Sequence, residues 1–302
     1  MRLAAGILPV LKPPGPSSQQ VVRAVAAMVG GGVRAGHAGT LDPAAAGVLL
    51  VGLGEATRIL GFLQGGDKRY RFELVLGVET DTQDATGHVV RRRDTLGLGR
   101  ADLERVLAEH VGRIRQRAPL HSARHVGGRR LYSYARQGEA VEAPEFEVDV
   151  HALRLLDFRA GTPALALCDL CCGAGTYVRA LASAIGARLG TGGHAGMLLR
   201  LGAGGVTVDR CHTIEEIGQA TSLGRLNTLV QTPAEALGFL PAVLLTRLEA
   251  ERVRHGIAPV IAADGAPELV RLLGPDGDLV AVAARGGTGV QLRCVLAGPD
   301  RA

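Results

Sequence analysis

One carboxylate in this chain stands in a setting that favours catalysis. Asp42 lies in the stretch G-H-A-G-T-L-D-P-A-A-A-G at 36–47, where glycines bracket a sharp turn and Pro43 follows the acid directly. Proline keeps the residue before it out of the helical region, so we expect Asp42 in an extended or turn conformation. The apolar run at 48–53 is typical of a short strand buried on both faces. This carboxylate therefore stands on a stiff loop at the mouth of a buried strand, and loops held by a rigid scaffold are where catalytic residues concentrate.

Taken alone, an L-D-P tripeptide more often marks a turn in which the aspartate accepts hydrogen bonds from its own backbone. The longer block, G-H-A-G-T-L-D-P followed by L-G-E-A-T at 53–57, resembles the catalytic motif of the TruB-type tRNA pseudouridine synthases. The resemblance implies that Asp42 is the nucleophile. It also implies that His37 occupies the space left by a flipped nucleotide or supports that nucleotide.

A second block, K-R-Y-R-F-E-L-V-L-G-V-E-T-D-T-Q-D-A-T-G at 68–87, resembles the family pattern K-x-Y, then L-G, then T-D-T-x-D-x-x-G. Tyr70 alone would be interpreted as a core tyrosine on a half-buried strand. The resemblance implies instead that it is the active-site tyrosine. We expect Asp81 and Asp84 to cap and hold the loop, because one nucleophilic carboxylate is enough.

A third block, C-G-A-G-T-Y-V-R at 172–179, resembles the family's strand-to-helix motif. Arg179 falls near the N-terminus of the expected helix, where the helix dipole disfavours a cation, so it needs a carboxylate partner. The resemblance implies that this partner is Asp42 and that Tyr177 packs against the target base. It also places Leu198 in the apolar wall and Lys12, from K-P-P-G-P-S-S, in the site. An exposed loop lysine is the alternative for Lys12.

The implied reaction breaks the N-glycosidic bond of a uridine and rejoins the base to the sugar through carbon. It needs a carboxylate, a cation that keeps this carboxylate ionised in a dry pocket, and a base for the remaining proton. Asp42, Arg179 and Tyr70 can take these roles in that order. Whether the aspartate attacks the sugar or the ring, and whether Tyr70 is itself the base, stays open. The target must be flipped out of its stack, and no metal or other cofactor is required.

The elements that position these residues follow from periodicity. We expect strands at 7–11, 69–76, 148–158 and 164–172, a helix at 19–29 capped by Ser17 or Ser18, a short helix from Glu55, and a helix ending at Gly190. The fold class is α+β. The resemblance implies a pseudouridine-synthase-type mixed sheet flanked by helices in a catalytic domain at 1–232. It also implies a small β-rich, PUA-like domain at 233–302.

Positive charge is concentrated between 91 and 136, where 12 arginines against 4 acids give a net charge of +8. Such a patch is expected of a protein that binds a phosphate backbone. By resemblance, 91–140 is an arm that grips RNA. The chain departs from the family pattern at Ala118, His121 and His125 in the arm. Further departures are Leu199, Leu201 and Gly202 in a glycine-rich segment that we interpret as an RNA-contacting loop.

Composition excludes other classes of protein. Hydrophobic residues make up 47% and charged residues 21% of the chain, and no apolar run approaches the roughly 20 residues of a bilayer span. We therefore expect a cytoplasmic protein with no membrane partner. Five cysteines, three of them at 168, 171 and 172, lack the second pair that a closed zinc site needs, so we interpret them as buried reduced thiols.

The substrate that the resemblance implies is tRNA, at uridine 55 of the T-arm, bound by a monomer that needs no protein partner. One alternative is a guide-RNA-dependent relative of the same chemistry. Another is a non-catalytic tRNA-binding or tRNA-folding protein with the same fold, which would not need Asp42, Tyr70 and Arg179. A glycoside hydrolase using Asp42 with Asp81 or Asp84 is disfavoured, because the chain has no tryptophan to form a sugar platform.

Overall fold

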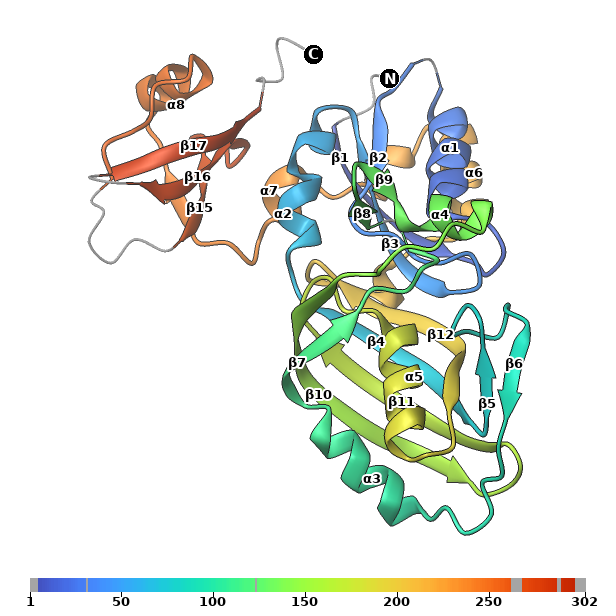
Figure 1. The fold of residues 1–302 in the computed structure, drawn as a ribbon. Helices are drawn as coiled ribbons and strands as arrows, with labels where there is room; N and C mark the ends of the chain where they lie inside the picture. The colour runs from blue at the N-terminus through green and yellow to red at the C-terminus, as the bar shows by residue number, and fades with distance from the viewer. Residues whose placement is uncertain (1–4, 31, 123, 262–267, 287–288, 297–302) are drawn as a thin grey trace. The chain divides into compact units, whose positions relative to one another are not determined.

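The computed structural model describes residues 5–30, 32–122, 124–261, 268–286 and 289–296, so parts of the predicted C-terminal domain lie outside the described residues (Figure 1). The chain forms two compact units. Unit 1 comprises Met1–Pro43, Gly47–Gly66 and Ala203–Ala302, and unit 2 comprises Ala44–Ala46 and Asp67–Gly202. The domain boundary near 232 stays a prediction, since this division follows chain contacts rather than that boundary.

Unit 1 contains the strand that follows the Asp42 loop. This strand, β3 (Ala46–Leu53), pairs antiparallel with β1 (Gly6–Lys12) and with β2 (Ala35–His37). Its side chains alternate between two hydrophobic clusters: Leu49 and Val51 pack with the α1 valines, whereas Val48 and Leu50 pack with Ile59 and its neighbours. All four are fully buried, which confirms a strand buried on both faces.

Two helices of unit 1 were predicted, and each begins within one residue of its predicted start. Helix α1 (Ser18–Val29) has Ser17 as its N-cap and a capping box with Gln20. The helix expected from Glu55 is a 3₁₀ helix, η1 (Gly54–Ile59), that continues as α2 (Leu60–Gln64). The other helical segments of unit 1 are η2 (Val208–Arg210), α6 (Ile214–Ser222), η3 (Leu226–Thr228), α7 (Pro233–Ala236) and α8 (Arg247–Arg254).

The C-terminal part is β-rich, as predicted. Its four-stranded sheet has the order β14 (Ala242–Leu244), β15 (Leu269–Leu273), β16 (Leu279–Gly286) and β17 (Gly289–Val295). The β14–β15 pair is parallel and the other two pairs are antiparallel. Ala250 and Val253 of α8 pack into the same hydrophobic cluster as this sheet. Unit 1 also holds the short strand β13 (Val206–Thr207).

Unit 2 is built on five strands in the order β12 (Gly193–Ala203), β4 (Lys68–Leu76), β11 (Ala164–Cys172), β10 (Glu145–Arg159) and β7 (Gly112–Arg117). Helix α5 (Val178–Arg188) packs on β4 and β7, and α3 (Arg100–Glu109) packs on β10 (Figure 1). On β4, Tyr70, Phe72, Leu74 and Leu76 are buried and alternate with more exposed residues, as predicted. The α+β class is therefore confirmed.

The glycine-rich segment that we expected to be a loop forms the 11-residue strand β12. Two of its glycines, Gly193 and Gly196, lie close to β4. A Cβ added at Gly196 would lie 2.6 Å from Glu73 Oε2, and one at Gly193 would lie 3.0 Å from the Val75 carbonyl. The sequence suggested a loop because glycine usually interrupts strands, whereas here it lets two backbones approach each other.

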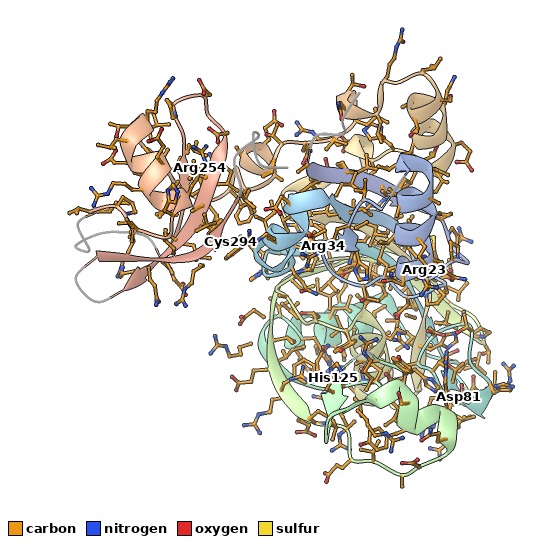
Figure 2. All side chains as sticks on the ribbon, turned by 90° about the horizontal axis from the view of Figure 1, so that it is seen from above. Arg23, Arg34, Asp81, His125, Arg254 and Cys294 are labelled. Atoms are coloured by element: carbon orange, nitrogen blue, oxygen red, sulfur yellow. The ribbon has the colours of Figure 1, made fainter. Side chains whose placement is uncertain are left out.

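Smaller hairpins complete unit 2. One joins β5 (Val78–Thr80) to β6 (Val89–Arg92), with Asp81 in the turn that follows β5. The arm holds β8 (His125–Val126), β9 (Arg129–Arg130) and α4 (Leu131–Gln137); Figure 2 labels His125 and Asp81.

Across the described part of the chain, no helix is both long and apolar enough to cross a membrane.

Candidate active site

The loop that carries Asp42 in unit 1 is held by the start of α1. Asp42 is half-buried and lies in irregular backbone between β2 and β3. The Leu41 N–H donates to Ser18 Oγ at 2.8 Å, and the same hydroxyl donates to the Leu41 carbonyl at 2.9 Å. Because Ser18 is 2% exposed, this pair of bonds fixes the backbone directly before the carboxylate in a dry environment.

Lys12 holds the other side of the same turn. Its side chain is fully buried, and Nζ donates to the carbonyls of Pro13 at 2.9 Å and Pro43 at 3.1 Å. The Gly15 N–H donates to the Pro43 carbonyl as well, at 2.8 Å. The exposed-lysine alternative is therefore wrong. Lys12 ties the K-P-P-G loop to the residue that follows Asp42.

His37 lies at the opposite end of the same connection. It is the last residue of β2, is half-buried, and pairs in register with Val51 of β3. The next residue, Ala38, donates its N–H to the Leu50 carbonyl at 2.9 Å. Unit 1 thus brings His37, Lys12 and Asp42 onto segments fixed to one buried strand pair. Their roles towards a substrate stay predictions.

Arg179 is the centre of the corresponding cluster in unit 2. It lies in the first turn of α5, and its side chain is 5% exposed. Nη1 donates to the Thr82 carbonyl and Nη2 to the His121 carbonyl, both at 3.0 Å. Asp84 Oδ2 lies 3.5 Å from Nη1. A carboxylate partner was predicted, and within unit 2 Asp84 fills that place. The pairing of Arg179 with Asp42 stays a prediction, because these residues belong to different units.

Asp84 organises its own loop, as predicted. Its Oδ1 accepts hydrogen bonds from the Thr82 hydroxyl at 2.7 Å, the Thr86 N–H at 2.9 Å and the Thr86 hydroxyl at 2.5 Å. Burial alone would raise the pKa of Asp84, but the hydrogen bonds from Thr86 and Thr82, together with the Arg179 charge, hold this pKa below its usual range. Asp84 is therefore a fixed anion that positions Arg179.

Two further features support the same loop. Asp81 Oδ1 accepts a hydrogen bond from the His88 N–H at 2.8 Å, so this carboxylate also holds the turn. Gln83, which lies between Asp81 and Asp84, has a φ of 62°, in the left-handed backbone region that few residues other than glycine adopt. Such backbone strain persists only where the surroundings determine the conformation strongly.

Tyr70 lies on β4 with 7% of its surface exposed, opposite Leu170 of β11. Lys68, two residues earlier on the same face, is equally buried. Burial lowers the pKa of Lys68, and the positive charge of Arg200 lowers it further. Sequence reasoning missed Lys68 as a neighbour of Tyr70, although the strand period of two in K-R-Y would have indicated it.

Tyr177 is the N-cap of α5, and Gln116 of β7 holds its backbone. The Tyr177 N–H donates to Gln116 Oε1 at 3.1 Å, and Gln116 Nε2 donates to the Tyr177 carbonyl at 3.4 Å. The Tyr177 ring packs edge-on with Phe146, with centroids 6.0 Å apart and planes at 74°. Leu198 lies half-buried on β12. Unit 2 thus holds Tyr70, Arg179, Tyr177 and Leu198.

A cavity of about 280 Å³ adjoins the Arg179 cluster within unit 2. Its walls are the loop 81–83, the segment 117–121 that follows β7, and residues 141–143. Arg179 binds one carbonyl in each of the first two walls, at Thr82 and His121. The position of the Arg179 guanidinium therefore depends on the distance between these two loops.

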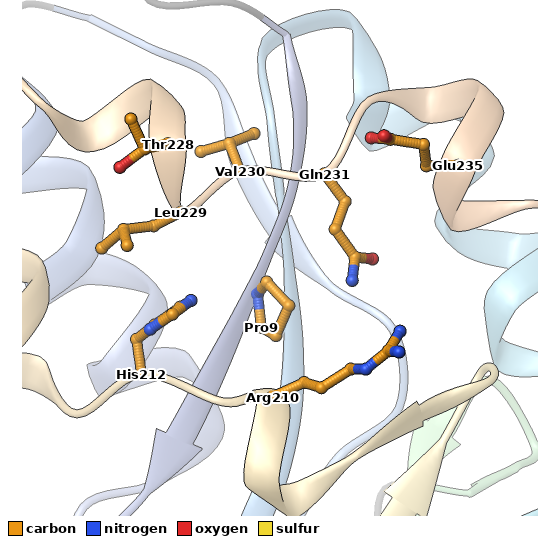
Figure 3. Close-up of a pocket in the computed structure, with 8 residues that line it drawn as sticks. All are labelled: Pro9, Arg210, His212, Thr228, Leu229, Val230, Gln231 and Glu235. Carbon is orange, nitrogen blue, oxygen red and sulfur yellow. The ribbon is translucent and has the colours of Figure 1, made fainter.

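A second cavity, of about 440 Å³, lies in unit 1 at the outer edge of β1 (Figure 3). None of the site residues predicted from the sequence lines it. Its lining residues are Pro9, Arg210, His212, Thr228, Leu229, Val230, Gln231 and Glu235.

The basic stretch carries less uncompensated charge than its composition indicates. Arg117 lies 2.9 Å from Glu145, and Arg113 lies 3.3 Å from Asp149, in both cases across the β7–β10 pair. Other arginines of the stretch pair with acids nearby. Among the described residues, those with no carboxylate within 4.0 Å are Arg91, Arg92, Arg115, Arg124, Arg130 and Arg136.

The cysteines of β11 lie within the sheet. Cys168 and Cys172 are fully buried, and burial raises the pKa of Cys168 to about 12 and that of Cys172 to about 11. Thiols with such a high pKa stay protonated and unreactive near neutral pH. Both are free and buried, as predicted, whereas Cys171 is free but only half-buried, because alternate residues of β11 face opposite sides of the sheet.

Comparison with known proteins gives a family and several relatives for this chain. The family described as TruB family pseudouridylate synthase (N terminal domain) matches residues 27–178. The tRNA pseudouridine synthase B of Symbiobacterium thermophilum is 44% identical over 256 residues, covering 85% of this chain and 83% of that protein. The one from Pelotomaculum thermopropionicum is 41% identical and covers 93% and 91%. Among solved structures, a chain of a Cbf5-Nop10-Gar1 complex matches with a TM-score of 0.74 and 25% identity, covering 96% of this chain and 83% of that one.

Proposed function

The chain belongs to the TruB family of pseudouridylate synthases, and we propose that it isomerises uridine to pseudouridine in tRNA, at uridine 55 of the T-loop, with Asp42 as the nucleophile. The observation that carries the proposal is the Asp42 turn. Leu41 before the carboxylate and Pro43 after it are each bonded to a buried side chain, Ser18 and Lys12 respectively. A turn held on both sides fixes the backbone from which the carboxylate projects, and nucleophilic attack requires such positioning.

The reaction starts when the target uridine leaves its stack, which costs a few kcal/mol. His37 fills the space that the base vacates or supports the flipped nucleotide. The Tyr177 ring and the Leu198 side chain form the walls against which the base packs. The Gln116 clamp on the Tyr177 backbone and the contact with Phe146 support this role, since a stacking ring must be held in place.

Asp42 then attacks the sugar or the pyrimidine ring, and the bond between N1 and the sugar carbon breaks. The base turns, a bond forms from its C5 to the same sugar carbon, the bond to Asp42 breaks with release of the carboxylate, and N1 takes up a proton. The proton on C5 leaves to a base, for which Tyr70 is the candidate. Arg179 supplies the positive charge that keeps the attacking carboxylate ionised. Its fixed position on the Thr82 and His121 carbonyls supports that role.

The protein acts on tRNA as a monomer in the cytoplasm, without a protein partner and without a cofactor. A T-arm hairpin carrying tritium at C5 of one uridine tests the proposal, with no other RNA or protein added. We expect tritium release from the position-55 label and none from a label elsewhere in the loop. Release only after a guide RNA is added would favour the guide-dependent alternative. Binding without release would favour the non-catalytic one.

A further inference from the structure

Arg124 is the arginine of the arm that lies against the aromatic side chains beside Tyr177. Its guanidinium carbon stands 3.9 Å from the centroid of the Phe146 ring. Phe146 in turn packs edge-on with Tyr177 at 6.0 Å. The three side chains therefore form one continuous stack, here called the Arg124 stack, that leads from the arm to the N-cap of α5.

The Arg124 stack is joined to the Gln116 clamp by strand register. Phe146 of β10 lies directly opposite Gln116 of β7, so the two side chains share a face of the sheet. Gln116 binds the backbone of Tyr177 on both its N–H and its carbonyl, and Phe146 contacts its ring. One cross-strand pair thus fixes Tyr177 by its main chain and by its side chain.

Arg124 differs from Arg129 in how its charge is balanced. Arg129 also stacks on an aromatic ring, but it lies 3.0 Å from Glu139. Arg124 is half-buried, and no carboxylate among the described residues lies within ion-pair distance of it. The Leu131 N–H donates to its carbonyl at 2.8 Å, which anchors its backbone to the arm.

A guanidinium that stacks by its face keeps its N–H donors, because these lie in the plane of the group and point outwards from its edge. Its charge is attracted to the ring and is available to an anion at the same time. In a protein that binds RNA, the anion that suits such a fork is a backbone phosphate. The charge of Arg124 is permanent, because a guanidinium does not lose its proton in proteins.

We propose that Arg124 binds a phosphate of the substrate RNA and, through Phe146, positions the Tyr177 ring for stacking on the target base. The proposal rests on the proposed function, since it assigns a positioning residue for that reaction. A phosphate bound at the edge of the guanidinium fixes its plane, and this plane then holds the Phe146 ring against Tyr177. Binding of the RNA phosphate by Arg124 and the position of the Tyr177 ring are therefore linked.

The test compares Arg124→Ala, Arg124→Lys and Phe146→Leu in single-turnover pseudouridine formation and in tRNA binding at several salt concentrations. The matched control is Arg159→Ala, an exposed arginine at the other end of β10 that pairs with Asp157. We expect Arg124→Ala to slow the single-turnover rate about 10-fold at saturating RNA and to reduce the salt slope of binding by about one phosphate contact. Arg124→Lys should restore the salt slope and only part of the rate.

Phe146→Leu keeps the apolar contact with the arm and removes the ring. We expect it to leave the salt slope unchanged and to slow the single-turnover rate about as much as Arg124→Ala does. The double variant should be no slower than Arg124→Ala, because both changes break the same stack. An Arg124→Ala enzyme with the wild-type rate at saturating RNA would overturn the proposal, as would rate losses that add in the double variant. Failure of the proposed function is distinct, because the wild type and Arg159→Ala would then form no pseudouridine.

Discussion

The two compact units each bury a cation beside a functional loop, and they hold it in different ways. In unit 1, Lys12 places one ammonium group on the carbonyls of Pro13 and Pro43. In unit 2, Arg179 spreads its planar fork over the carbonyls of Thr82 and His121, with the Asp84 carboxylate 3.5 Å away. An ammonium can rotate to meet its acceptors, whereas a guanidinium requires acceptors at fixed angles.

The difference indicates a division of labour. Lys12 sets the shape of the turn that carries Asp42, and this role requires a side chain long enough to donate hydrogen bonds to both carbonyls. Arg179 has its direction set by three groups from two loops, and the role that we propose for its charge requires such a fixed direction. Asp84 supports this arrangement as an anion of lowered pKa. Variants at these positions should therefore fail in different ways.

The largest effect among them is expected at Arg179. Arg179→Lys keeps the charge but cannot reach both carbonyls with one group, so we expect the single-turnover rate to fall about 10²–10³-fold, with tRNA binding changed little. Arg179→Met should be at least as slow. A lysine variant within a few-fold of the wild-type rate would show that the fork geometry is unimportant and would remove the contrast with Lys12.

Lys12→Met should act on stability as well as rate. It removes the hydrogen bonds from a buried ammonium group to the carbonyls of the exposed residues Pro13 and Pro43, at a cost of about 1–3 kcal/mol in the free energy of unfolding. We expect a rate about 10-fold or more below wild type, because the Asp42 turn loosens. Urea unfolding and single-turnover kinetics measure the two effects. A slow variant of unchanged stability would mean that Lys12 acts on the substrate and not on the turn.

Asp84→Asn is expected to change the pH dependence of stability. The pKa of Asp84 is lowered in the folded protein, so its contribution is fully present above the ordinary aspartate value of 3.8 and is lost as pH falls through the lower folded pKa. The difference in unfolding free energy between wild type and variant should therefore shrink as the pH falls below about 4. A difference that stays constant from pH 7 to pH 2 would show that the charge of Asp84 contributes nothing.

The smallest expected effect is a difference in the salt slope of tRNA binding between variants of ion-paired and unpaired arginines on β7. Arg115→Gln removes a cation that lies opposite Glu147 in register but has no carboxylate within 4.0 Å among the described residues, so the salt slope of tRNA binding should fall by about 0.9. Arg113→Gln should change the slope less, because Asp149 and Glu147 already offset that charge. Equal changes in the two variants would show that these ion pairs open when RNA binds.

Much of the fold could be predicted from the sequence. The alternation on β4, the run of apolar residues in β3 and the Ser17 cap of α1 are local patterns, and each gave the observed element. The glycines of β12 led to a wrong prediction of a loop. A strand whose glycines allow close approach to a neighbouring strand has the same composition as a loop, and only the neighbouring strand distinguishes the two. Such packing depends on residues more than 100 positions away.

The candidate site shows the same limit. The need of Arg179 for a carboxylate followed from its place at a helix N-terminus, but which carboxylate lies beside it did not. Asp84 was predicted to cap its own loop, and the structure gives it this role together with the contact to Arg179. Likewise, the ion pairs of Arg113 and Arg117 depend on the β7–β10 register, which no local pattern of the basic stretch contains.

The central claim is that Asp42 is the nucleophile of a tRNA pseudouridine synthase. The most direct measurement is tritium release from T-arm RNA labelled at uridine C5, comparing the wild type with Asp42→Asn. We expect release by the wild type and a decrease of about 10⁴-fold or more in the variant, with tRNA binding retained, because asparagine keeps the shape of the turn without its nucleophile. An Asp42→Asn enzyme that releases tritium near the wild-type rate would contradict the account.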